Sequence, residues 1–143
     1  MALILPFLLA FAGGAIDLSR AYAAWLTVES ATRNAAEYAA TNSADAFAAA
    51  TDARSIVCQE ARTTPGFTPG SGTDPIENCT APTVSVVAFT VSSTQTGGSF
   101  LNPIGTAHVR TQLVFTTLFP YPLLPSGGWT LTADATYSVV RGR

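Results

Sequence analysis

Sixteen uncharged residues, most of them apolar, come before the first charged position, Asp17. From Leu3 to about Arg62, little interrupts a helical pattern except Pro6 and the pair Gly13-Gly14. Pro6 falls in the first two turns, where its missing N–H is tolerated. Each glycine lowers helix propensity by about 1 kcal/mol relative to alanine and favours a bend. The pattern predicts one long helix to about residue 62, with a bend at Gly13-Gly14.

A loop and then a sheet are predicted for the rest of the chain. Residues 63–82 are rich in proline and glycine, which break any periodicity. Three strand-like segments follow at 83–92, 106–119 and 129–140. Every second residue from Trp129 to Val139 is apolar and those between are polar, a period of two that buries one face of a strand. Because short connections favour antiparallel pairing, we expect an α+β fold. In it, an antiparallel sheet of three or more strands (83–143) packs against the second half of the helix.

The predicted helix is too long to be buried. Sixty helical residues would reach about 90 Å, so part of the rod must project, and the projecting part is its apolar end. We therefore expect a projecting helix half at 1–26 and a globular domain at 27–143. The side chains expected to pack with other apolar groups at this end are Met1, Leu3, Ile4, Leu5, Phe7, Leu8, Phe11 and Ile16. The apolar connection at 120–128 either folds back onto the sheet or contacts a neighbouring subunit.

Two interpretations of the apolar segment remain open. Sixteen helical residues cover about 24 Å of a hydrocarbon core of about 30 Å, and extension to Leu26 would add Tyr22 and Trp25 as interfacial aromatics. The segment is then either a permanent single-pass anchor or one that leaves the membrane to pack against copies of itself. Asp17 and Arg20 stand three apart on one helical face. Buried in an assembly, they would compensate each other either within one chain or between copies, and such a pair sets register more than it adds stability.

Composition narrows the functional classes. Hydrophobic residues make up 48% and charged residues 11%, the net charge is −2 and all seven cations are arginines, so no basic face is available for nucleic acid. Two cysteines are too few for a four-ligand zinc site. In an exported chain, Cys58 and Cys79 are expected to form a disulfide that closes the loop. Asn78-Cys79-Thr80 fits the N-glycosylation pattern, which also occurs often by chance.

No catalytic or metal site, and no cofactor, is expected from the sequence. His108 is the single histidine and falls on the polar face of a predicted strand, where no partners that would complete a metal site or a catalytic triad are expected for it. The carboxylates are scattered, and the glycine pairs have the pattern of turns rather than of phosphate-binding loops.

The apolar start, the alanine-rich continuation and the terminal sheet together resemble the type IV pilin-like architecture. The closer resemblance is to the TadE-like (tight-adherence) pseudopilin family. It is carried by four segments: Ala2-Leu3-Ile4-Leu5-Pro6, Asp17-Leu18-Ser19-Arg20, the stretch at 31–39, and Phe119-Pro120-Tyr121-Pro122-Leu123-Leu124. Many bacterial pilins carry glutamate at position 5 of the mature chain, where this chain has Leu5.

The resemblance implies a structural subunit, a pilin, of an extracellular type IV or Tad-like filament on the cell surface, with a role in adhesion and no enzymatic activity. The partners it implies are copies of the chain, an inner-membrane assembly machinery, a prepilin peptidase and, before assembly, membrane lipid. Met1 would then be a processed terminus. Three alternatives are a minor priming pseudopilin, a single-pass anchored domain that binds a ligand or partner, and a secreted enzyme. The absence of a catalytic constellation in the sequence opposes the last.

Overall fold

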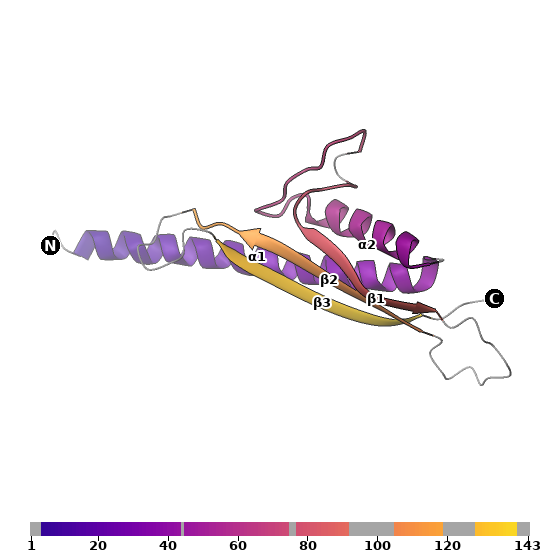
Figure 1. The fold of residues 1–143 in the computed structure, drawn as a ribbon. Coiled ribbons are helices and arrows are strands. Elements are labelled where there is room, and N and C mark those ends of the chain that lie inside the picture. The colour runs from indigo at the N-terminus through magenta and orange to yellow at the C-terminus, as the bar shows by residue number, and fades with distance from the viewer. Residues whose placement is uncertain (1–3, 44, 75–76, 92–104, 119–127, 140–143) are drawn as a thin grey trace.

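The computed structural model describes residues 4–43, 45–74, 77–91, 105–118 and 128–139. Two helices precede three strands: α1 (Ile4–Asn42), α2 (Ala46–Ala61), β1 (Thr83–Val91), β2 (Gly105–Phe115) and β3 (Trp129–Val139). The strands form one antiparallel sheet in the order β1-β2-β3. Figure 1 shows this sheet lying along the second half of α1. The predicted α+β class and pilin-like layout are confirmed.

The helical part of the chain is two helices, so the prediction of one helix to about residue 62 is wrong. α1 ends at Asn42, and α2 begins at Ala46 and folds back along α1. The Asp45 side chain caps α2 by accepting hydrogen bonds from the backbone N–H groups of Phe47 and Ala48. The Ser43 hydroxyl donates to Asp52 of α2 at 2.7 Å. Short polar side chains of this kind compete with helical hydrogen bonding, which alanine cannot do.

Small side chains bring the two helices and the sheet close together. The central core cluster contains Ala31, Ala35 and Ala36 of α1, which pack with residues of α2, β2 and β3; the latter are Ala53, Val57, Val109 and Ala135. All but Ala135 are fully buried. An alanine presents only one methyl group, so neighbouring backbones approach closely without a void. The alanine-rich composition therefore serves the packing of this core as well as helix propensity.

The strands alternate as a half-buried sheet requires. In β2, every second residue from Ala107 to Phe115 is buried and those between are largely exposed. Thr111 occupies one of the buried positions, which the sequence pattern did not indicate. In β3, Ala133, Ala135 and Val139 are buried, whereas Trp129 and Tyr137 stay 39% and 37% exposed. The predicted strand ends at 92, 119 and 140 lie outside the described residues.

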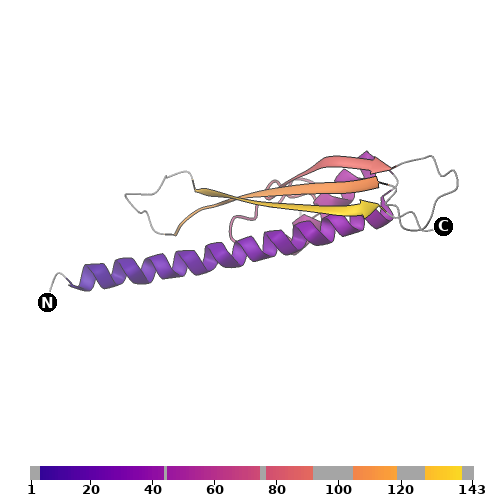
Figure 2. The same cartoon turned by 90° about the horizontal axis from the view of Figure 1, so that it is seen from below.

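The first part of α1 extends beyond the sheet. Figure 2 shows it continuing past the ends of β2 and β3, with the start of α1 and the C-terminal end of β3 at opposite ends of the described chain. Packing of the sheet against α1 reaches back to Ala21 and Ala24, which contact Leu113 and Phe115. The globular part therefore includes helix residues that precede position 26, and the division into 1–26 and 27–143 stays a prediction.

Candidate functional site

The N-terminal half of α1 is an exposed apolar surface. Every described residue from Ile4 to Ala12 is exposed. The exposed large apolar side chains of α1 up to residue 26 are Ile4, Leu5, Phe7, Leu8, Leu9, Phe11, Ile16, Leu18, Tyr22, Trp25 and Leu26. Burying one such side chain is worth about 1.5–3 kcal/mol. The set includes all the side chains expected to pack with other apolar groups at this end, except those of Met1 and Leu3, which lie outside the described residues.

By length and composition α1 could cross a membrane, and its exposure distinguishes it from the core helix of a soluble protein. Only 17% of its most apolar 18-residue window is buried, whereas a core helix would be mostly buried. A contiguous apolar surface of this size marks contact with protein or lipid. Gly13 and Gly14 are helical within α1, with no melted turn, so a bend there in an assembly stays a prediction.

Asp17 stands where the exposed half of α1 meets the sheet. Asp17 is 5% exposed, and its Oδ1 accepts a hydrogen bond from the backbone N–H of Leu118 at 3.0 Å. The same oxygen lies 3.2 Å from Nη1 of Arg20. A buried carboxylate with these two donors is compensated within one chain. The Asp17/Arg20 pair thus forms within the subunit, and a role for it between subunits stays a prediction.

Arg20 extends this junction toward the end of β2. Its guanidinium carbon lies 5.6 Å from the centroid of the Phe115 ring, within the range of a cation–π contact. Its side chain remains 33% exposed, so the cation is held by Asp17 and Phe115 without being sealed from solvent. The two charged residues therefore fasten the last turn of the exposed helix half to the end of β2.

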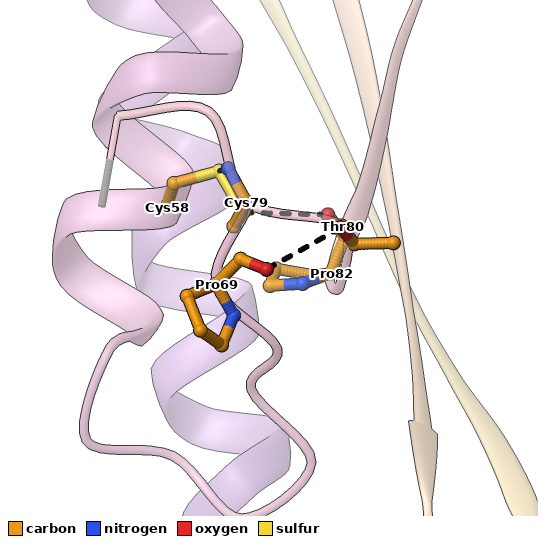
Figure 3. Close-up of a disulfide and its surroundings, with 5 residues drawn as sticks. All are labelled: Cys58, Pro69, Cys79, Thr80 and Pro82. Carbon is orange, nitrogen blue, oxygen red and sulfur yellow. Dashed lines mark hydrogen bonds between the residues drawn. A yellow bond between two sulfur atoms is a disulfide. The ribbon is translucent and has the colours of Figure 1, made fainter. Parts of the chain in front are cut away.

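Cys58 and Cys79 are bonded, with their Cα atoms 5.6 Å apart. Figure 3 shows the bond joining α2 to the segment that leads into β1. Beside it, the Thr80 hydroxyl donates to the carbonyl oxygen of Pro69 at 3.4 Å. The loop is closely packed at Gly70, where a Cβ atom would lie 1.5 Å from the carbonyl oxygen of Asn78. Asn78 is exposed, and its glycosylation stays a prediction.

The outer face of the sheet carries a charge cluster that joins β2 and β3. Oδ1 of Asp134 accepts a hydrogen bond from Nε of Arg110 at 2.8 Å and lies 3.1 Å from Nε2 of His108. His108 therefore has a hydrogen-bond partner in Asp134, a contact that the sequence did not indicate. Antiparallel pairing places Arg110 directly opposite Asp134, a relation that depends on strand register and cannot be seen in sequence spacing.

The hydrogen bond from Arg110 holds the pKa of the Asp134 carboxyl below its ordinary value. Partial desolvation opposes this effect, and the hydrogen bond with His108 adds to it. The carboxylate is therefore ionised over a wide pH range, which is the state of a structural ion pair rather than of a proton donor. Elsewhere in the described part of the chain, no group of three or more His, Cys, Asp or Glu residues is placed to hold a metal ion.

The segment that contains the exposed helix half and the Asp17/Arg20 pair matches a known family. Residues 1–37 match the TadE-like protein family. The match confirms the resemblance inferred from the apolar start and the Asp17-Leu18-Ser19-Arg20 element, and it ends within α1, before the helix reversal. No curated protein and no solved structure matches the chain. The chain is therefore similar to TadE-like proteins over its N-terminal segment, which carries the exposed apolar side chains.

Sequence reasoning found the apolar surface and both residues of the Asp17/Arg20 pair. It missed the Leu118 contact of Asp17 and the whole cluster of Arg110, Asp134 and His108. Leu118 is 101 positions from Asp17, and it takes part through its backbone, which has no sequence signal. For the Arg110 and Asp134 contact, the alternating strand patterns placed both residues on the polar face. A committed register for the two strands would have paired them.

Proposed function

We propose that this protein is a structural subunit of an extracellular Tad-like filament that polymerises through the exposed half of α1. The observation that carries the proposal is the contrast along this one helix. One face of its second half is buried by α2 and the sheet, whereas its first half presents large apolar side chains that stay 49–76% exposed in the described chain. Identical helices packed side by side would cover these side chains, and membrane lipid would cover them before assembly.

The proposal also implies a route by which the chain reaches the filament. The chain would reside in the inner membrane after synthesis, be processed by a prepilin peptidase and be extracted by an assembly machinery. In the filament the helices would form the core, and the polar outer face of the sheet would face solvent, where it could serve adhesion or surface attachment. The family match over 1–37 and the exposed helix half support this sequence of events.

Two matched phenylalanines provide the test. Phe11 is 76% exposed on the proposed assembly half, and Phe47 is 82% exposed at the start of α2. In the natural host, Phe11→Ala should lower the amount of this chain in sheared surface filaments about tenfold or more, since each subunit loses about 1.5–3 kcal/mol of burial. Phe47→Ala should leave the amount unchanged. The measurement is immunogold electron microscopy with quantitative blotting of the sheared fraction.

The outcomes separate the alternatives. A chain that is the main protein of the filaments is a major subunit, whereas a few copies per filament indicate a minor priming pseudopilin. A chain that never leaves the membrane fraction, and whose yield is insensitive to Phe11→Ala, would contradict the proposal and support an anchored binding domain. Membrane insertion is expected in both variants because alanine is tolerated in an apolar helix.

A further inference from the structure

Exposed apolar side chains from α1 and from the sheet lie together at the end of the sheet nearest the N-terminus. We name them the proximal collar: Leu18, Tyr22, Trp25, Leu118 and Trp129. Each is between 38% and 67% exposed. Two of them are far from the helix in sequence, so only the fold brings the set together.

Three contacts fix the collar at one level along α1. Asp17, beside Leu18, accepts the hydrogen bond from the backbone of Leu118. Arg20 lies over the ring of Phe115, and Phe115 pairs directly with Trp129 across the sheet. Figure 2 shows the corresponding ends of β2 and β3 beside the middle of α1. Leu118 and Trp129 therefore continue the apolar surface of the helix onto the end of the sheet.

The chemistry of the collar fits the interfacial layer of a bilayer. Tyr22 and Trp25 lie with their ring centroids 6.1 Å apart, and tyrosine and tryptophan are the residues enriched at membrane–water interfaces. From Leu18 to Trp25 the helix rises about 10 Å, comparable with the depth of about 5–10 Å that interfacial side chains occupy. Arg20 is partly exposed at the same level, where a guanidinium can reach lipid phosphates.

Placement of the collar deeper in the bilayer is opposed by the unpaired backbone groups at the edges of the sheet. β1 and β3 are the outer strands of an open sheet, and unpaired strand edges are not tolerated in hydrocarbon. Shallower placement would leave Leu118 and Trp129 in water. The Asp17 carboxylate can lie close to the membrane because Leu118 and Arg20 already compensate it.

We propose that, before assembly, the proximal collar lies in the headgroup layer, so that Leu118 and Trp129 contact lipid together with α1. The end of the sheet would then contact the membrane surface, so that the globular domain is held to the membrane by the sheet as well as by α1. The inference rests on the membrane stage of the proposed function, and it concerns the sheet, which that function does not require to touch lipid.

The chain offers an internal probe, because Trp25 and Trp129 are its only two tryptophans. Full-length chain would be reconstituted in phosphatidylcholine vesicles whose lipids are brominated in the upper acyl chain, where bromine quenches nearby tryptophan. Trp25→Phe leaves Trp129 as the reporter, and Trp129→Phe leaves Trp25. The control combines Trp25→Phe, Trp129→Phe and Tyr137→Trp, which moves the reporter about 27 Å along β3. Tyr137 is 37% exposed, against 39% for Trp129.

We expect Trp129 fluorescence to fall about twofold in brominated relative to plain vesicles, as for a side chain within about 10 Å of the acyl boundary. The reporter at position 137 should be unaffected. Quenching of Trp25 without quenching of Trp129 would overturn the inference and leave the proposed function intact. The inference is also overturned if Trp129 shifts to shorter emission wavelength without quenching, which indicates a second copy covering the collar. Failure of both tryptophans to be quenched overturns the inference together with the membrane stage of the proposed function.

Discussion

At the scale of single residues, Asp17 connects α1 to the segment that follows β2. Its buried carboxylate holds both the Leu118 backbone N–H and the Arg20 guanidinium, which come from opposite sides of the junction between α1 and the sheet. The hydrogen bond joins residues 101 positions apart, so it helps to offset the conformational entropy that the chain loses when this long loop closes. The acidic residue in the Asp17-Leu18-Ser19-Arg20 element therefore has a structural task inside one subunit.

Asp17→Ala should lower the free energy of unfolding by about 1–3 kcal/mol, because it leaves a half-buried N–H without its acceptor. Asp17→Asn keeps an acceptor oxygen and should cost less. The measurement is urea unfolding in mild detergent, followed by tryptophan fluorescence. Asp74→Ala, at an exposed position, is the control and should stay within about 0.5 kcal/mol of the parent. Equal midpoints for Asp17→Ala and the parent would show that the contact contributes nothing.

The Arg110, Asp134 and His108 cluster makes a second prediction at this scale. The folded-state pKa of Asp134 is lowered, so the contact contributes stability above the ordinary aspartate pKa of about 3.9, and this stability is lost as the pH falls through the folded value. Arg110→Gln should raise the Asp134 pKa toward its ordinary value, because it removes the strongest cause of the lowering. His108→Gln should raise it less. Carboxyl NMR titration measures both, and the reverse ranking would refute the assignment of Arg110 as the main partner.

At the scale of elements, the seam between α1, α2 and the sheet depends on small side chains. Ala35 is fully buried in the central cluster with Val109 and Ala135. Ala50 of α2 is exposed. Both residues are alanines within helices and have the same helix propensity, so a difference between substitutions at the two positions reports the packing around Ala35.

Ala35→Leu should destabilise the domain by about 1–3 kcal/mol through overpacking. Ala50→Leu should have little effect, since a leucine there would point into solvent. Urea midpoints of the two variants, compared with the parent, are the measurement. If Ala35→Leu were as stable as Ala50→Leu, the seam would be looser than the structure describes.

The elements themselves were largely predictable because periodicity reports local structure directly. The alternation from Trp129 to Val139 predicted β3 over the residues that the structure describes, and the composition of 63–82 predicted the loop. The helix reversal was not predicted because alanine favours helix on both sides of it. The residues that end α1 and start α2 act through hydrogen bonds of individual side chains, such as the cap of Asp45, rather than through a periodic pattern.

The candidate site was predictable in part for the same reason. Exposure of the apolar helix half follows from length, since a rod of this size cannot be covered by the rest of the chain. The contacts of Asp17 and His108 depend on strand register and on a backbone group distant in sequence, and neither has a local signature. The proximal collar also has no local sequence signature, because it is formed by residues that are distant in sequence.

At the scale of the whole molecule, α1 is shared between two environments. Residues from Ile4 to Ala12 are exposed, whereas Asp17 and the residues after it anchor the folded domain. The fold of the domain should therefore be independent of the first three turns of the helix.

Removal of residues 1–12 should leave a folded domain with the urea midpoint of the parent and much less need for detergent. Removal of residues 1–20 also deletes Asp17 and Arg20, so it should lower the midpoint. Size-exclusion chromatography and urea unfolding of the two truncated chains provide the measurement. Loss of folding in the shorter truncation would mean that the exposed half of α1 supports the domain.

If the chain is exported as proposed, the bond between Cys58 and Cys79 would also record its passage out of the cytoplasm. Structural disulfides form in oxidising compartments and are rare in the cytosol, where thiols are kept reduced. Under the proposed function, a molecule with two free thiols would be one whose globular part has not yet been translocated, and a molecule with the disulfide would be one whose globular part has. Alkylation of the free thiols would measure the fraction of molecules in each state, and its change with time would follow export separately from filament assembly.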